Sequence, residues 1–357
     1  MLARCFILGL LTSSTFAVFD KSVITMTRFN CAFPLCPTTA LDVVSLDEHY
    51  ELGRPHILAT LIEQTPTAEM NFQAYSAFDN STRSHYTLAA RAVGGEATNS
   101  LFTVIITANG TSGSLSATST IVFPPTAAQA DITYFFTNNG IVYIAFRTGI
   151  LLSVSPSTGS VNASTYLPAG LIGTLACVFD AQSRTLYANA LGSGGSFLTS
   201  FSVATMTSGA TVGPLPATPN TGAGPNGERI DVAVAQLAVR SPATAPLRLM
   251  ELRTSIDFPW IFMAFLDPVS GNSTEIALPD DWYKMWDIDP EIFPEQWLGS
   301  THRVWDYDPV NNRAWFKLYD ECDQADDCDE DESIVYLQWA TGCEKMKYLY
   351  ICYMLIA

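Results

Sequence analysis

An acidic segment near the C-terminus holds the residues best suited to chemistry. Residues 322–333 read CDQADDCDEDES, and their carboxylate oxygens are the hard ligands that calcium requires. An EF-hand loop beginning at Asp327 has acids at its first, third and fifth positions, but Glu332 stands where glycine is needed and Gln338 where glutamate is needed. The alternatives are a calcium site, a site for a basic partner, or a solvated loop whose charges repel one another. The candidate metal ligands are Asp323, Asp327, Asp329 and Asp331.

Aromatic rings beside carboxylates form a second candidate site, in residues 279–300. Flat rings cover the apolar faces of sugars or peptides, and carboxylates accept hydrogen bonds from hydroxyl or ammonium groups. The alternative is that these rings pack the segment onto the rest of the protein, because large aromatic side chains are often buried. The candidate binding residues are Trp282, Trp286, Asp287, Asp289 and Trp297.

No catalytic motif accompanies these two segments. Residues 222–227 read GAGPNG and match the glycine spacing of a dinucleotide-binding loop, but Pro225 interrupts them and no strand precedes them. The histidines have no metal-binding spacing, and the chain has neither a Gly-x-Ser-x-Gly elbow nor a Walker loop. We therefore assign no catalytic residue and expect a binding or structural module rather than an enzyme.

The negative charge of the chain is concentrated beside both candidate sites. The net charge is −17, and the stretch from residue 278 to the end has 18 acidic and 6 basic residues. Six of the seven tryptophans lie in the same stretch. Such a field disfavours nucleic acid and anionic membranes, and it favours cations or a basic partner.

The N-terminus and the glycosylation sequons predict a secreted protein. Arg4, the apolar run 6–11 and the small residues 13–17 match a signal peptide, which we assign to residues 1–17. No later window has the roughly 18 uninterrupted apolar residues that a membrane-spanning helix needs. The sequons place candidate N-linked glycans at Asn80, Asn109, Asn162 and Asn272.

Seven cysteines remain after removal of the signal peptide. Cys177 lies in an apolar run and is the candidate buried thiol, which leaves six cysteines for three disulfides in an oxidising compartment. The pairing stays open, because Cys31 and Cys36 could bridge locally, as could Cys322 and Cys328, or these two pairs could cross-link one another. The six cysteines are Cys31, Cys36, Cys322, Cys328, Cys343 and Cys352.

Both candidate segments belong to a repeated β pattern that runs through the chain. An apolar strand ends in Phe-Asp or a variant, and a second, alternating strand later runs into a glycine-containing turn. Repeats of this kind indicate an array fold. We call the end of the first strand in each repeat the Phe-Asp phrase; it ends at residues 20, 79, 137, 180, 240 and 308. The glycines of the later turns are Gly53, Gly113, Gly159, Gly209, Gly271 and Gly342.

Each repeat accommodates four strands, which we name A to D in chain order. In the fourth repeat we predict strands over 171–179, 185–191, 197–203 and 210–215, with Asn, Asp, Ser, Gly and Pro in the turns. The whole pattern predicts an all-β fold: a single β-propeller domain over residues 18–357, with six blades of four antiparallel strands, or seven if one is degenerate. A β-sandwich is the alternative, but a sandwich of about 100 residues does not give six in-phase repeats.

The chain resembles secreted β-propellers whose blades carry an Asp-containing A–B turn and a Thr-Gly or Ser-Gly C–D turn. The matching segments are 179–187, 307–315, 157–159 and 340–342, and the Gly-His and Trp-Asp signatures of WD40 blades are missing, so we assign no narrower family. The resemblance implies that A–B and C–D turns share one face, and that ligands bind the opposite face, at the B–C and D–A connections. On this map the sequons fall on the first face, and the cysteines, acids and tryptophans fall on the second.

The first repeat has room for only a short strand A, so we predict that a C-terminal strand over 348–355 completes its sheet. The function predicted from these observations is that of an extracellular binding or structural module for a protein or glycan partner, and a basic partner is one option. The alternative is a calcium-dependent propeller hydrolase or lactonase-like enzyme, which needs carboxylates that converge on the central channel from several blades.

Overall fold

The structure is a computed structural model, and its ordered elements are all β-strands. It describes residues 23–32, 35–45, 56–64, 73–93, 96–108, 110–127, 132–168, 177–192, 195–215, 232–240, 248–255, 261–276, 305–308, 313–318, 333–338 and 350–354. This part of the chain confirms the all-β prediction and contains no helix that could span a bilayer.

The described strands form six antiparallel sheets, which we number in chain order. Sheet 1 contains β1 (Val23–Ala32), β2 (Leu35–Ser45) and β3 (His56–Gln64). Sheet 2 contains β4 (Gln73–Asp79), β5 (Ser84–Val93), β6 (Glu96–Ile106) and β7 (Gly113–Ile121); sheet 3 contains β8 (Ile132–Asn138), β9 (Ile141–Phe146), β10 (Ile150–Val154) and β11 (Val161–Tyr166).

The second half of the chain repeats this arrangement. Sheet 4 contains β12 (Cys177–Asp180), β13 (Thr185–Gly192), β14 (Gly195–Ser202) and β15 (Thr207–Val212). Sheet 5 contains β16 (Val232–Arg240), β17 (Arg248–Ser255), β18 (Ile261–Leu266) and β19 (Ser273–Ile276); sheet 6 contains β20 (Trp305–Asp308), β21 (Arg313–Leu318), β22 (Ser333–Gln338) and β23 (Tyr350–Met354).

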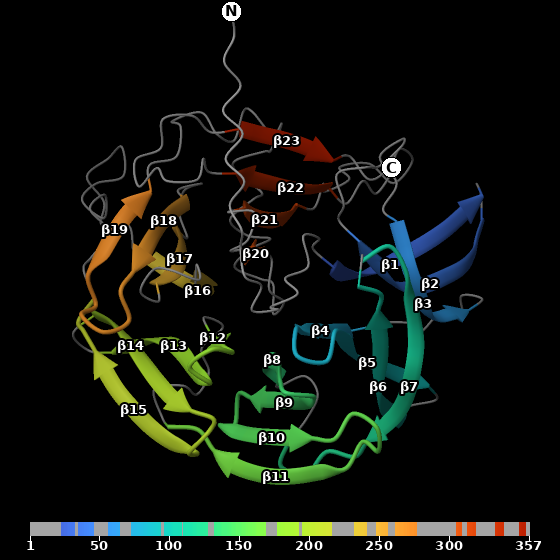
Figure 1. Cartoon of the computed structure of the whole chain (residues 1–357), viewed down its shortest axis with the longest axis horizontal. Helices are drawn as coiled ribbons and strands as arrows, with labels where there is room; N and C mark the ends of the chain where they lie inside the picture. Colours follow the sequence, from blue (N-terminus) through green and yellow to red (C-terminus); the bar gives the residue numbers. More distant parts are fainter. Residues whose placement is uncertain are drawn as a thin grey trace, which may run out of the picture.

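The sheets stand radially around a common centre, as in a β-propeller (Figure 1). In each sheet the strands pair in chain order, so every sheet is an antiparallel meander. In sheets 2 to 6 the first strand lies nearest the centre and the fourth lies at the rim (Figure 1). The propeller prediction is therefore confirmed, with four strands in each of sheets 2 to 6.

The Phe-Asp phrase marks the end of the innermost strand in every sheet where the structure describes it. Asp79, Asp180, Arg240 and Asp308 are the last residues of β4, β12, β16 and β20, and Thr137 lies one residue before the end of β8. The first copy, at residues 19–20, lies outside the described residues. The phrase is thus a reliable marker of strand A, as predicted.

Of the four described glycines of the pattern, Gly159 and Gly271 lie in the predicted turns, Gly113 is the first residue of β7 directly after its turn, and Gly209 lies away from its turn. Gly209 lies inside β15, and the C–D turn of sheet 4 is formed by residues 203–206, in which Met206 has φ of 56°. The strands predicted over 197–203 and 210–215 therefore begin two and three residues earlier. A side chain at Gly209 would overlap Ser200 on the neighbouring strand, so this glycine permits close strand approach rather than a turn.

The C-terminal strand completes the last sheet, and the prediction that 348–355 completes the first sheet is wrong. β23 pairs with β22, from Ile334 opposite Met354 to Gln338 opposite Tyr350. Pairing with the strand that precedes it in the chain closes a shorter loop, which costs less conformational entropy than reaching the first sheet. Among the described residues, sheet 1 has three strands.

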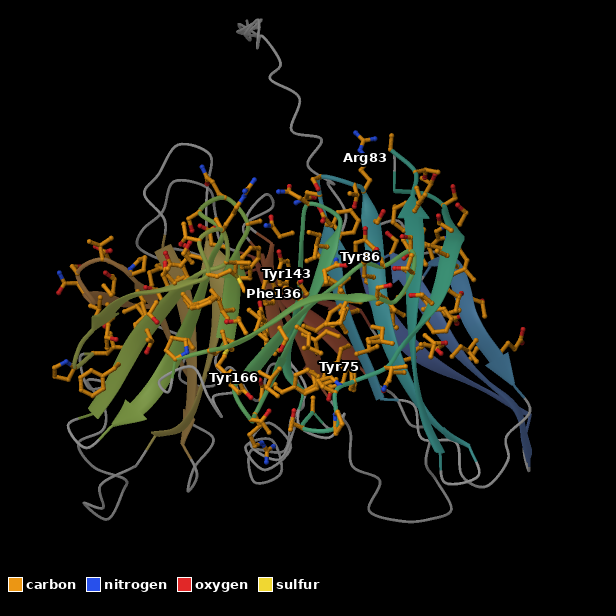
Figure 2. All side chains as sticks on the ribbon, turned by 90° about the horizontal axis from the view of Figure 1, so that it is seen from below. Tyr75, Arg83, Tyr86, Phe136, Tyr143 and Tyr166 are labelled. Atoms are coloured by element: carbon orange, nitrogen blue, oxygen red, sulfur yellow. The ribbon has the colours of Figure 1, made fainter. Side chains whose placement is uncertain are left out.

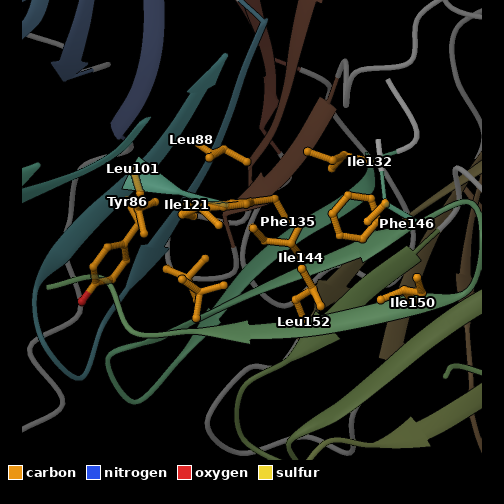
Figure 3. Packing of buried hydrophobic residues seen from close by; sticks show 13 residues of the cluster. Tyr86, Leu88, Leu101, Ile121, Ile132, Phe135, Ile144, Phe146, Ile150 and Leu152 are labelled. Carbon is orange, nitrogen blue, oxygen red and sulfur yellow. The ribbon is translucent and has the colours of Figure 1, made fainter. Parts of the chain in front are cut away.

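Apolar side chains fill the interfaces between neighbouring sheets. Between sheets 2 and 3, Leu88 and Leu101 of one sheet pack with Ile144, Phe146 and Leu152 of the other (Figure 3). Further clusters join sheets 1 and 2, sheets 3 and 4, and sheets 4 and 5. Since burial of one such side chain contributes about 1.5 to 3 kcal/mol, these interfaces hold the described sheets in their radial order.

Candidate functional site

The two ends of the sheets form two different faces of the molecule. Because each sheet is a meander, all A–B and C–D turns lie at one end, which we call the turn face, and all B–C and D–A connections lie at the other, which we call the loop face. Arg83, in an A–B turn, and Tyr166, at the start of a D–A connection, lie at opposite edges of the side view (Figure 2).

Both segments that the sequence proposed as sites begin and end at the loop face. Residues 277–304 connect β19 to β20 as a D–A connection, and residues 319–332 connect β21 to β22 as a B–C connection. The candidate binding residues of the first segment and the metal-ligand candidates of the second lie outside the described residues. Their place in the chain topology agrees with the predicted map, and their roles stay predictions.

The loop face also exposes apolar side chains at the ends of rim strands. Tyr166 is the last residue of β11 and is 71% exposed, and Val122 directly follows β7 and is 79% exposed. The turn face has a comparable residue in Val269, which is 84% exposed in a C–D turn. Exposed apolar side chains therefore occur on both faces and do not by themselves locate a partner.

The aspartate of the Phe-Asp phrase builds the turn face. The amide and hydroxyl of Ser81 donate to Oδ1 of Asp79, at 2.8 and 2.6 Å. The amide of Gly140, in the next sheet, donates to Oδ2 of the same carboxylate at 2.6 Å. Asp79 thus closes its own turn and ties sheet 2 to sheet 3. The residue type alone predicts the turn and not the link between the two sheets.

Two other aspartates close turns within their own sheets. Asp180 accepts from the amides of Gln182 and Ser183, at 3.1 and 3.0 Å. Asp267, which begins a C–D turn, accepts from the amide of Val269 and the hydroxyl of Ser270, both at 2.8 Å. These carboxylates are engaged in turn structure, so the repeated aspartate is an architectural residue rather than a ligand-binding one.

Three of the four sequon asparagines lie exposed on the turn face. Asn80 is in the A–B turn of sheet 2, Asn272 ends the C–D turn of sheet 5, and Asn162 is the second residue of β11, just after a C–D turn. Asn109 lies outside the described residues. The predicted placement on one face agrees with these three positions, and their glycosylation stays a prediction.

The cysteines predicted to lie in loops are partly in strands. Cys31 and Cys36 belong to β1 and β2, whose ends at Ala32 and Leu35 are nearly adjacent, so the loop predicted around them is a tight hairpin. Cys352 lies in β23. Cys177 is a buried thiol, 4% exposed, as predicted. The other three cysteines lie outside the described residues, and the disulfide pairing stays a prediction.

A buried polar cluster between sheets 1 and 2 was missed by sequence reasoning. Nε2 of His85 lies 2.8 Å from Oγ1 of Thr25, which lies 3.1 Å from Oγ1 of Thr87. Burial lowers the pKa of His85 from 6.5 to about 4, so this imidazole is neutral at pH 7. The spacing of the histidines tests for metal ligands alone and does not reveal this cluster. A usable signal is that His85, Thr87 and Ala89 alternate along one strand and so lie on the same face of it.

The part of the chain that the structure describes has no group of three or more His, Cys, Asp or Glu side chains that could hold a metal ion. Three aromatic rings of sheets 3 and 4 stack on one another: the centroid of the Phe136 ring lies 4.9 Å from that of Tyr143 and 4.5 Å from that of Phe179. The hydroxyl of Tyr134 accepts from the amide of Phe179 at 3.0 Å, so the stack joins two sheets.

Comparison with known proteins adds solved structures of low similarity. No protein-family model matches the chain, and no curated protein matches it in sequence. A crystal structure of a nidogen/laminin complex matches at 7% identity over 89% of each chain, with a TM-score of 0.44. The WD40 domain of Toxoplasma gondii coronin matches at 11% identity over 92% of this chain and 68% of that one, with a TM-score of 0.45. At these values the fold assignment rests on the sheet topology.

Proposed function

We propose that this protein is an extracellular β-propeller that binds a protein or glycan partner through its loop face. One observation carries the proposal: the Trp-rich segment 277–304 and the acidic segment 319–332 both begin and end at the loop face, whereas Asn80, Asn162 and Asn272 lie on the turn face. Glycans on one face leave the other free for a partner.

The charge of the chain supports a basic partner. The net charge is −17, and the acids are concentrated in the last two repeats. A negative field attracts a basic protein or an amine-bearing glycan, and it speeds the encounter most at low salt. Because salt screens such a field over about 8 Å at physiological ionic strength, binding that depends on it weakens as salt is added.

A binding screen with matched variants tests the proposal. The secreted protein is applied to a glycan array and to an array of basic peptides, together with the variant Trp282→Ala/Trp286→Ala and the turn-face control Asn80→Gln. We expect binding that is lost in the double tryptophan variant and kept in the control. Binding that survives in the tryptophan variant and fails in the control would place the partner on the turn face and overturn the proposal.

The calcium hypothesis is tested separately, because its ligands lie outside the described residues. If residues 319–332 bind calcium, adding the metal stabilises the folded protein by mass action and raises the Tm, by an amount that grows with calcium concentration. The variant Asp327→Asn/Asp329→Asn should lose this rise, while Asp131→Asn, outside the segment, should keep it. An unchanged Tm in the parent protein removes the calcium site, and with it the calcium-dependent hydrolase alternative.

A further inference from the structure

The cluster of His85, Thr25 and Thr87 is a polar island in an otherwise apolar interface. His85 is 1% exposed, and its cross-strand neighbours include Val104 of β6 and Phe78 of β4. Thr25 stands opposite Val43 in sheet 1, and Val43 and Val104 belong to the cluster that joins the two sheets. Among the described residues, the side-chain hydrogen bonds of this cluster therefore join its own members.

The hydrogen-bond partners of His85 favour one tautomer of its neutral imidazole. Nδ1 of His85 has no hydrogen-bond partner among the described residues. The arrangement that leaves no N–H orphaned has Nε2–H donating to Thr25, the Thr25 hydroxyl donating to Thr87, and Nδ1 bare. Protonation would add both a charge and an N–H group at Nδ1, where the described structure offers no acceptor.

No ionisable neighbour with a described side chain compensates for that charge. Burial is the sole cause of the lowered pKa of His85. Asp79 of β4 is engaged in its turn, and Asp42 of β2 lies on the strand face opposite to Val43. The ionisable residues with described side chains on the strands and turns packed around His85 are Asp42, His56, Glu63, Tyr75, Asp79, Arg83 and Tyr86.

The position of the island matters because sheet 1 depends on this interface. β1 contacts β4, and β3 contacts β6 and β7. No pair of described strands from sheets 1 and 6 is in comparably extensive contact. Among the described residues, sheet 1, which lies between sheets 2 and 6 in the ring, is therefore held chiefly by its contacts with sheet 2, on the side where the buried histidine lies (Figure 1).

We propose that the cluster of His85, Thr25 and Thr87 is an acid-sensitive joint, at which protonation of His85 releases sheet 1 from sheet 2. The direction follows from linkage. We call the state with sheet 1 packed on sheet 2 closed, and the state with sheet 1 released open. Because the pKa of His85 is lowered in the closed state, the open state binds a proton more readily. The closed state is therefore favoured above pH 6.5, and its stability falls as the pH falls from 6.5 towards 4. The same shift predicts about 20-fold more opening at pH 5 than at pH 7.

Hydrogen exchange of the whole protein measures this opening. Amides of β1, β2 and β5 are compared at pH 7 and pH 5, after correction for intrinsic exchange rates, with β9 and β10 as an internal reference. We expect protection of sheet 1 to fall by roughly 20-fold at pH 5 while the reference strands keep theirs. In His85→Gln the amide nitrogen can still donate to Thr25 and does not titrate, so the acid response should vanish. His56→Gln, at an exposed histidine, should respond like the parent protein.

Two results would overturn the proposal: equal protection of sheet 1 at both pH values, or an undiminished acid response in His85→Gln. If that variant does not fold, the imidazole resonances of the parent protein decide the matter. Titration of His85 near pH 6.5 with sheet 1 intact contradicts the joint. Titration below pH 5 together with loss of the folded signals of sheet 1 supports it.

Discussion

A single carboxylate at Asp79 serves two sheets. It accepts from the Ser81 amide and hydroxyl within its turn and from the Gly140 amide of the next sheet. Asp180 has the same place in sheet 4 but is bonded to two amides of its own turn. Both carboxylates are buried, so the donors that they satisfy depend on them.

We expect Asp79→Ala to destabilise the protein by about 2 to 4 kcal/mol, because it orphans donors in two sheets. Asp180→Ala should cost about 1 to 2 kcal/mol, because it orphans donors in one turn. Denaturant unfolding of both variants measures the difference, and Asp79→Asn, which keeps one acceptor oxygen, should fall between the parent protein and Asp79→Ala. Equal losses for the two alanine variants would show that the link between sheets adds nothing.

Two glycines with similar backbone conformations have different neighbours. Gly140 has φ of +75° and Gly159 has φ of +70°, where a side chain costs about 1 to 2 kcal/mol. A Cβ at Gly140 would lie 3.2 Å from Cγ2 of Thr82, whereas one at Gly159 would overlap the backbone carbonyl of Thr120 in sheet 2. Gly159→Ala should therefore cost about 1 to 3 kcal/mol more than Gly140→Ala in urea unfolding. The clash is refuted if the two variants unfold at the same urea concentration.

Four rim strands of this propeller, β7, β11, β15 and β19, are protected in two different ways, whereas the rim strand β23 has neither a charged residue nor a register shift. β7, β11 and β15 lie in stretches without charged residues, and each pairs with its inner neighbour through a register shift. β19 carries Glu275 and pairs with β18 without such a shift. Charges and local bulges are alternative means of discouraging edge-to-edge pairing, so the bulges compensate for the uncharged edges of sheets 2 to 4.

The edge of β15 offers a test of this interpretation. Ala210 is exposed in β15, and Ala210→Lys places a charge on the strand edge without removing a described side-chain contact. We expect less light scattering when the protein is held just below its Tm, with the free energy of unfolding changed by no more than about 0.5 kcal/mol. Ala210→Ser, which adds no charge, should aggregate like the parent protein. If both variants scatter equally, pairing at this edge does not drive aggregation.

Local sequence signals predicted the repeated strands and turns of the whole molecule. Features that depend on pairing between distant parts of the chain were not predicted. Asp79, Asp180 and Asp308 end innermost strands as predicted, because a strand end and its turn are specified by adjacent residues. The predicted partner of β23 was wrong, because the C-terminal strand could pair with the first sheet or the last sheet of the ring, and its apolar pattern does not distinguish the two. The contact between Thr25 and His85 joins residues 60 apart in the chain, so no local motif predicts it.

The distribution of sequons makes a prediction for the molecule as a whole. In protein collected from the culture medium, we expect peptides with Asn80, Asn109, Asn162 and Asn272 to carry N-linked glycans, removable by peptide N-glycosidase with conversion of each Asn to Asp. Asn139 is exposed in a turn of the same face but begins no sequon, so it should stay unmodified.

Changing Asn80, Asn162 and Asn272 together to Gln should leave loop-face binding intact, because these positions lie at the other end of the sheets. Retention of the chain inside the cell, or bare asparagines in the secreted protein, would contradict the extracellular assignment or the glycan-covered turn face, respectively.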